Sequence, residues 1–256
     1  MLWLRSQLFN ILFYINTALF LVFGSWLLLA PRSWAMQGLR AHAATSMLLM
    51  RLICGTKVVV RGREHLPDRP FLIAAKHQSA WDTFALIPIF HDPALVMKAE
   101  LMKIPLYGWF STKFGMIPIR RETGPSALRE MLREAQSRRD DGREILVFPE
   151  GTRRLPGAPA DYKPGVLMLY DRLNIACVPV ALNSGLFWPR NSLLRYPGTI
   201  IVEILPPIPP ELPRKDFARR LQETVETATE RLVDAERARR SAVQDPELSG
   251  ATPREP

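Results

Sequence analysis

The amino-acid sequence predicts a single α/β domain built on a mixed, largely parallel sheet of about seven strands flanked by helices. Three observations support this fold class. Short apolar runs follow one another from residue 57 onward, helix-like segments lie between several of them, and 47% of the 256 residues are hydrophobic, enough to bury a sizeable core. A hydrophobic and then amphipathic two-helix segment precedes the domain, and we expect it to meet a membrane.

The seven runs are rich in the aliphatic residues that strands favour and are bounded by turn-forming residues. They cover residues 57–61, 71–75, 94–97, 116–119, 144–148, 175–182 and 199–205. Apolar side chains at helical spacing predict helices over 126–136, 165–173 and 214–240. The last of these is expected to pack on the domain after a stiff, proline-rich connector at 206–213.

Residues 8–30 form an apolar block without a charged side chain. The block is long enough to cross the hydrocarbon core, which needs about 20 apolar residues. A cleaved signal peptide is the less favoured alternative, because the block is long for one and only Arg5 marks its amino end. Residues 34–53 are apolar but interrupted by Arg40, His42 and Arg51. They predict either an amphipathic helix on the membrane or, equally, an ordinary core-facing helix.

The chain therefore divides into membrane-associated helices at 1–55, the α/β domain with its C-terminal helix at 56–240, and a polar tail at 241–256 that we expect to be disordered. The net charge of +9 suggests an anionic partner, either nucleic acid or a membrane surface. No nucleic-acid-binding motif is found, so the membrane is favoured. Cys54 and Cys177 form no CxxC pair, and the four histidines are not grouped as metal ligands, so no disulfide framework or metal site is predicted.

A histidine and a carboxylate stand five positions apart, at His77 and Asp82, where a predicted strand gives way to a predicted helix. On one continuous helix they would face apart, so they meet most easily if His77 lies in the loop and Asp82 in the first helical turn. There the carboxylate can accept a hydrogen bond from one imidazole nitrogen and leave the other free as a base. The alternative is that Ser79 and Asp82 form only a helix-capping box.

Two further polar clusters follow predicted strands, at residues 120–123 and 149–154. In open α/β sheets, functional side chains gather in loops at the carboxyl ends of strands, and the His77 loop occupies such a position. Arginines in both clusters offer planar donor groups suited to phosphate oxygens, and Gly151 lets the backbone approach a ligand closely. Either cluster alone fits a solvated or salt-bridged strand end equally well. Together with the histidine and carboxylate they favour one shared site.

Four sequence blocks stand in one order along the chain. They are His-x-x-x-x-Asp at 77–82, Gly-Met-Ile-Pro-Ile-Arg at 115–120, Phe-Pro-Glu-Gly-Thr-Arg at 148–153 and Val-Pro-Val at 178–180. In type, order and spacing they resemble the blocks of the 1-acyl-sn-glycerol-3-phosphate acyltransferases and their glycerolipid acyltransferase relatives. Lys-Ala-Glu-Leu at 98–101 and Lys-Pro-Gly at 163–165 also resemble segments of that family. The resemblance covers roughly residues 55–205.

The resemblance implies a role for each matching residue. His77 is expected to act as general base on the free sn-2 hydroxyl of lysophosphatidic acid as that hydroxyl attacks an acyl thioester. Asp82 is expected to orient the imidazole and stabilise its charged form. Arg120 and Arg153, helped by Lys98, are expected to hold the phosphomonoester. The substrate hydroxyl is itself the nucleophile, so no acyl-enzyme is needed.

The acceptor site is expected to be shaped by Glu150, Gly151 and Thr152, with the carboxylate bonding the glycerol or orienting an arginine. A backbone amide near the His77 loop or near Gly151 is the expected oxyanion donor. No cofactor is implied; the co-substrate is an acyl-CoA or acyl carrier protein thioester.

The implied partners are a lipid bilayer, lysophosphatidic acid and the acyl donor, and the implied product is phosphatidic acid for phospholipid biosynthesis. The implied location is a bacterial-type inner membrane, with the active site at its cytoplasmic face. An alternative within the family is an acyltransferase for glycerol 3-phosphate or another lysolipid, such as a lyso-ornithine lipid. An alternative outside it is a non-catalytic tether that binds anionic lipid and does not need His77.

Overall fold

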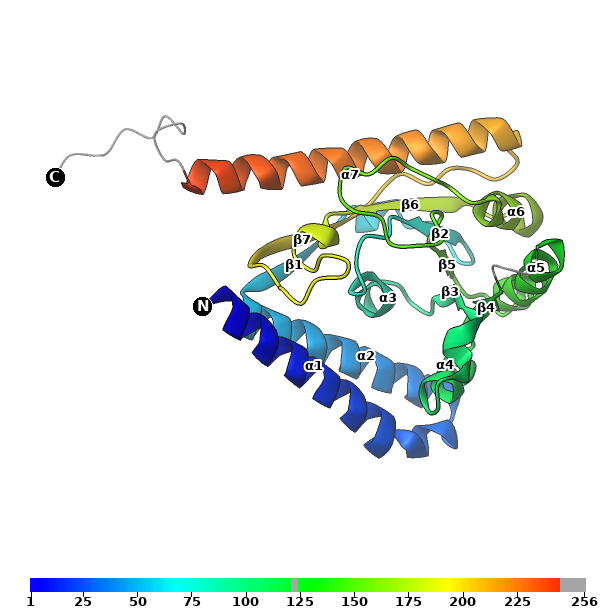
Figure 1. Ribbon diagram of the computed structural model, residues 1–256. Coiled ribbons are helices and arrows are strands. Elements are labelled where there is room, and N and C mark those ends of the chain that lie inside the picture. The colour runs from blue at the N-terminus through cyan, green and yellow to red at the C-terminus, as the bar shows by residue number, and fades with distance from the viewer. Residues whose placement is uncertain (121–123, 245–256) are drawn as a thin grey trace.

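The computed structural model describes residues 1–120 and 124–244, in which seven strands form one sheet (Figure 1). All seven predicted strands are confirmed, each within two residues of its predicted ends. Across the sheet the order is β1-β7-β6-β2-β5-β3-β4. The strands are β1 (Thr56–Arg61), β2 (Leu72–Ala75), β3 (Ala94–Lys98), β4 (Ile117–Ile119), β5 (Ile145–Val147), β6 (Cys177–Leu182) and β7 (Gly198–Ile204).

The sheet is mixed and largely parallel, as predicted. β6 and β7 pair antiparallel, and the other neighbouring pairs in the described sheet are parallel. β2 lies at the centre, where Ile73 is level with Leu146 of β5 and Val178 of β6. Every residue of β2 and β6 is buried. Such continuously apolar strands require helices on both faces of the sheet.

Alternation along β2 assigns each helix to a face. Ile73 points into a core shared with Phe9, whereas its neighbour Leu72 points into a core shared with Phe217. On the Ile73 face lie α1 (Leu2–Phe23), α2 (Arg32–Leu49), α3 (Asp82–Ala85) and α4 (Tyr107–Phe114). On the Leu72 face lie α5 (Pro125–Asp140), α6 (Pro164–Leu173) and α7 (Arg214–Gln244) (Figure 1). Short 3₁₀ turns lie at Ser25–Leu28, Arg63–His65, Ile87–Ile89, Ala99–Lys103 and Ser184–Leu186, and a π turn at Met50–Cys54.

The C-terminal helix α7 is longer than the sequence predicts. It continues to Gln244, four residues beyond the predicted helix end at 240, and so includes the first four residues of the predicted disordered tail. No glycine or proline interrupts residues 214–244, and the Ser241 hydroxyl donates to the Arg237 carbonyl within the helix, at 3.1 Å. Residues 245–256, the rest of the predicted tail, lie outside the described residues.

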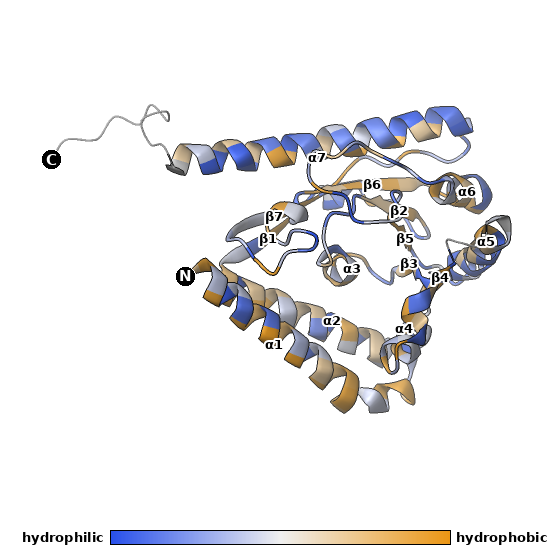
Figure 2. Cartoon of the chain, in the orientation of Figure 1, coloured by the Kyte–Doolittle hydropathy of each residue, from blue (hydrophilic) through white to orange (hydrophobic). Residues whose placement is uncertain are grey.

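The amino-terminal helices α1 and α2 form a hairpin beneath the sheet (Figure 1). The apolar run predicted over 8–30 is divided, because α1 ends at Gly24 and α2 starts only after Pro31. Of the described helices, α1 has the length and apolar composition of one that crosses a membrane. Figure 2 shows the contrast between α1, which is mostly apolar, and α7, which is mostly hydrophilic.

Polar bonds fix the hairpin to the domain at both ends. Near the amino terminus, Asn10 Nδ2 donates to the Leu193 carbonyl at 2.9 Å, and Ser6 Oγ accepts from the backbone N–H of Arg195 at 2.9 Å. At the start of α2, Arg32 donates two hydrogen bonds to Asp92, at 2.9 and 2.6 Å. The hairpin therefore has one defined position relative to the sheet.

The helix α2 confirms one of the two alternatives that the sequence left open for residues 34–53, the core-facing helix. Ala35 and Met36 are buried in the core beneath the sheet. Trp34 and Leu48, in contrast, are exposed large apolar side chains. One side of α2 is thus a core-facing helix and the other presents apolar surface outward.

Candidate active site

His77 lies in the loop that follows β2, and Asp82 is the first residue of α3. Their placement agrees with the sequence expectation. His77 Nδ1 and Asp82 Oδ2 are 3.0 Å apart. An ionised carboxylate can only accept hydrogen bonds, so Nδ1 is the donor in this contact, and in the neutral imidazole Nε2 then keeps its lone pair.

The Asp82 carboxylate is fully buried and held by three further donors. Oδ2 also accepts from the backbone N–H groups of Gln78 at 2.8 Å and Ser79 at 2.9 Å. Oδ1 accepts from the Ser184 hydroxyl at 2.6 Å. The bond to Ser79 is the carboxylate half of a capping box, while Ser79 Oγ accepts from the Trp81 amide instead. The same carboxylate thus holds the turn that leads into α3 and orients His77.

The imidazole of His77 lies flat on the ring of Phe148, with ring centroids 4.0 Å apart and an angle of 13° between the planes. Its side chain is 12% exposed and lines a cavity of about 530 Å³. The Asp82 bond and the stacked ring together leave the imidazole little freedom to rotate. A histidine held with one free nitrogen at a cavity can serve as a general base.

Six of the eight site residues predicted from the sequence line this cavity: His77, Lys98, Arg120, Glu150, Gly151 and Thr152. Asp82 lies behind His77. Arg153 is not among the lining residues; its backbone carbonyl accepts from Arg190 at 2.7 Å. The loop after β2 and the loop after β5 are joined, because the Arg154 N–H donates to the His77 carbonyl at 2.7 Å. The rest of the predicted 120–123 cluster, residues 121–123, lies outside the described residues.

The model of the acyltransferase family matches residues 57–183, a range that contains the histidine, the carboxylate and the cavity loops. The chain belongs to the acyltransferase family. It is 35% identical over 158 residues to the 1-acyl-sn-glycerol-3-phosphate acyltransferase of Pseudomonas aeruginosa and 31% identical over 191 residues to that of Saccharomyces cerevisiae. These alignments cover 62% and 73% of this chain but only 62% of each relative, less than two thirds of its length.

The fold of this acyltransferase-family chain is also similar to a solved structure. The crystal structure of a 1-acyl-sn-glycerophosphate (LPA) acyltransferase from Thermotoga maritima superposes with a TM-score of 0.76 at 25% sequence identity. The superposition covers 91% of this chain and 98% of that chain. The predicted family and the predicted fold class are both confirmed.

Within this family member, Glu150 has partners that the sequence did not predict. Its carboxylate is buried and accepts from Lys76 Nζ at 2.8 Å and from the backbone N–H of His77 at 3.4 Å. Burial raises the pKa of the Glu150 carboxyl above its usual value, although the Lys76 ammonium opposes the shift. Glu150 therefore joins the loop after β2 to the loop after β5.

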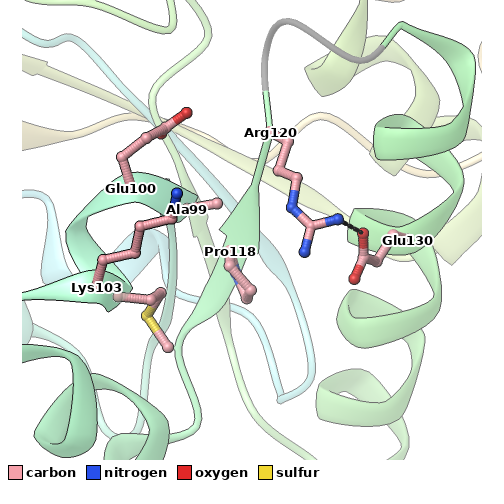
Figure 3. A pocket seen from close by; sticks show the side chains of 7 residues that line it. Ala99, Glu100, Lys103, Pro118, Arg120 and Glu130 are labelled. Atoms are coloured by element: carbon pink, nitrogen blue, oxygen red, sulfur yellow. Dashed lines mark ion pairs between the residues drawn. The ribbon is translucent and has the colours of Figure 1, made fainter.

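Arg120 lies at the rim of the site, between two cavities. Besides the cavity at His77, it lines a second one of about 330 Å³ with Pro118, Lys103 and Glu100. Figure 3 shows its guanidinium turned toward Glu130 of α5, at 3.7 Å. The Arg120 side chain is 64% exposed, so this ion pair is weak and the guanidinium is able to exchange Glu130 for a stronger anion.

Ser184 was not predicted as a site residue, and its removal has a predictable cost. Ser184→Ala leaves a buried carboxylate oxygen of Asp82 without its donor, so we expect the free energy of unfolding to fall by about 1–3 kcal/mol. Denaturant unfolding measures this change. Ser241→Ala, which removes an exposed hydroxyl from α7, is the control and should change stability by less than about 0.5 kcal/mol. Equal stabilities of the two variants would contradict a tightly held carboxylate.

Proposed function

We propose that this chain transfers a fatty acyl group from an acyl thioester to the sn-2 hydroxyl of 1-acyl-sn-glycerol 3-phosphate, forming phosphatidic acid. The observation that carries the proposal is the His77–Asp82 pair, whose imidazole lines a largely apolar cavity together with cationic side chains. The two relatives compared above are named 1-acyl-sn-glycerol-3-phosphate acyltransferases, which supports this substrate class.

In this mechanism His77 acts once as a base and once as an acid. Its Nε2 takes the proton of the sn-2 hydroxyl while the hydroxyl oxygen attacks the thioester carbonyl. The resulting imidazolium is stabilised by the Asp82 carboxylate, which bonds Nδ1. As the tetrahedral intermediate collapses, the C–S bond breaks and the proton passes to the departing thiolate. No covalent acyl-enzyme forms.

The phosphate of the acceptor is held by Arg120 and Lys98, both on the cavity lining. Charge-assisted bonds to the phosphate fix the glycerol and so bring the hydroxyl to His77. Lys163 lines the same cavity and adds a third cation. Arg153 belongs to this group only if its side chain turns toward the cavity when the acceptor binds.

The hairpin of α1 and α2 attaches the chain to the membrane in which the acceptor resides. On α1, large apolar side chains remain exposed along its length, among them Leu4, Ile11, Tyr14 and Val22. Because the hairpin is bonded to the domain at both ends, we propose that it lies in one leaflet of a bacterial-type inner membrane and holds the cavity at the cytoplasmic interface. The water-soluble donor, acyl-CoA or acyl carrier protein, then reaches the site from the cytoplasm.

The test is transfer of a radiolabelled acyl group from acyl-CoA to lysophosphatidic acid by the detergent-purified protein, with Arg120→Ala beside wild type. We expect phosphatidic acid from wild type. Loss of a charge-assisted bond of about 1.5–3 kcal/mol should raise the KM for lysophosphatidic acid by about 10- to 100-fold and change kcat little.

The matched control is Arg133→Ala, which removes an exposed guanidinium of α5 outside the cavity lining and should leave KM unchanged. Acyl carrier protein as donor, and glycerol 3-phosphate or a lyso-ornithine lipid as acceptor, form the other arms. Turnover with one of those acceptors and none with lysophosphatidic acid would overturn the proposed substrate. Inactivity with every pair would favour the lipid-binding tether.

A further inference from the structure

A charged side chain is buried directly beside the proposed base. Lys76 precedes His77, and its backbone N–H continues the sheet by donating to the Val180 carbonyl at 2.9 Å. The side chains of Lys76 and His77 point in different directions. The imidazole stacks on Phe148, whereas the Lys76 ammonium contacts Glu226 on α7. Only 2% of the Lys76 side chain is exposed. A buried ammonium is costly unless carboxylates and hydrogen bonds surround it.

Two carboxylates satisfy the Lys76 ammonium. Nζ lies 2.8 Å from Glu150 Oε1, and 2.9 and 2.7 Å from the two oxygens of Glu226. An ammonium has three N–H groups, so these three oxygens use its full donor capacity. The Tyr162 hydroxyl donates to Glu226 Oε1 at 3.0 Å and completes the cluster.

The cluster joins four segments that are distant in the sequence. Lys76 directly follows β2, Glu150 lies in the loop after β5, Tyr162 precedes α6, and Glu226 lies on α7. The helix holds Glu226 firmly, since the neighbouring Val225 is fully buried in the core beneath α7. The other end of the cluster reaches the active site, because Glu150 also accepts from the His77 backbone N–H.

We propose that Lys76 and Glu226 are positioning residues that lock the His77 loop to α7. Neither side chain lines the cavity, so neither touches substrate. Glu226 fixes the Lys76 ammonium, and Lys76 fixes the Glu150 carboxylate. Because Glu150 also accepts from the His77 backbone N–H, this chain of contacts sets the position of the imidazole. This role rests on the acyl transfer proposed above, for which a displacement of the base by about 1 Å can cost about 100-fold in rate.

The test is Glu226→Gln in the full chain, purified in detergent. The glutamine keeps the size of the side chain but removes the charge that neutralises Lys76. We expect kcat to fall by about 10- to 100-fold while the KM for lysophosphatidic acid stays within about twofold. Lys76→Met should lower kcat at least as much, and the double variant should lose no more than Lys76→Met alone, because Glu226 acts through Lys76.

Glu203→Gln is the control for a purely structural effect. Glu203 is 19% exposed, against 18% for Glu226, and it also pairs α7 with the sheet, through Arg231. We expect Glu203→Gln to keep wild-type kcat even if its Tm falls as far as that of Glu226→Gln. An equal loss of kcat in both variants would mean that α7 matters only for stability and would overturn the proposal.

A second readout does not depend on turnover. The rate at which diethyl pyrocarbonate modifies His77, followed by peptide mass spectrometry, reports the position and environment of the imidazole. We expect this rate to change in Glu226→Gln and not in Glu203→Gln. If wild type transfers no acyl group, the proposed function fails, and this rate alone then decides the positioning role. Wild-type values of both kcat and modification rate in Glu226→Gln would overturn it.

Discussion

Replacing His77 with alanine is expected to lower kcat by about 10²–10⁴-fold, the range that a well-placed general acid or base contributes. The protein should still fold, because Asp82 keeps its bonds to Gln78, Ser79 and Ser184 when the imidazole is removed. The KM for lysophosphatidic acid should change little, since Lys98 and the other cavity-lining cations proposed to hold the phosphate remain. Steady-state kinetics with acyl-CoA in detergent micelles measures both constants.

His91→Ala is the control for this change. His91 is exposed, contacts Arg69 and does not line the cavity, so its removal should leave kcat and KM at wild-type values. Turnover by His77→Ala at a rate similar to that of His91→Ala would show that His77 is not the base, and the tether would then become the better explanation of the fold.

Asp82→Asn is expected to lower kcat by up to about 10⁴-fold with little loss of stability. An asparagine can place its carbonyl oxygen where Oδ2 stands, so it still accepts from Gln78, Ser79 and the His77 ring. Its amide nitrogen then meets the Ser184 hydroxyl, which accepts as well as donates. The geometry survives, and what is lost is the negative charge that stabilises the imidazolium.

Asp82→Ala separates this electrostatic effect from a structural one. It leaves the buried N–H groups of Gln78 and Ser79 without an acceptor, at about 1–3 kcal/mol for each. We therefore expect a clear fall in Tm for Asp82→Ala and a Tm near wild type for Asp82→Asn, with kcat low in both. A fully active Asp82→Asn would show that the charge of the carboxylate is not needed and that Asp82 serves only to hold the turn before α3.

The strands were predictable because each is a short apolar run between turn residues, and this signal is local. The directions of β1 and β7 were not predictable, because they depend on which strands pair across the sheet. Thr56 of β1 pairs with Gly198 of β7, which is distant from it in the sequence. The helix α4 was missed for another reason. It spans only Tyr107–Phe114, about two turns, which is too short for apolar periodicity to stand out.

The contacts of the site likewise divide into local ones, which could be predicted, and long-range ones, which could not. His77 and Asp82 are five residues apart, so their meeting could be predicted from a loop and one helical turn. Ser184 lies 102 residues from Asp82, and Glu226 lies 150 residues from Lys76. No local pattern connects such pairs. Lys76 in particular follows an apolar run and looks in the sequence like a solvated strand end, because nothing near it indicates two carboxylates.

The docking of the hairpin also has a consequence for how the chain is made on the ribosome. Asn10 bonds the carbonyl of a residue 183 positions later, so α1 leaves the exit tunnel long before its place on the domain exists. At about 5–20 residues per second the delay is about 10–40 s. Throughout that interval Phe9 and its neighbours lack the core that will cover them. A nascent chain with an uncovered apolar hairpin benefits from translation beside a membrane, which shields the hairpin until the domain closes over it.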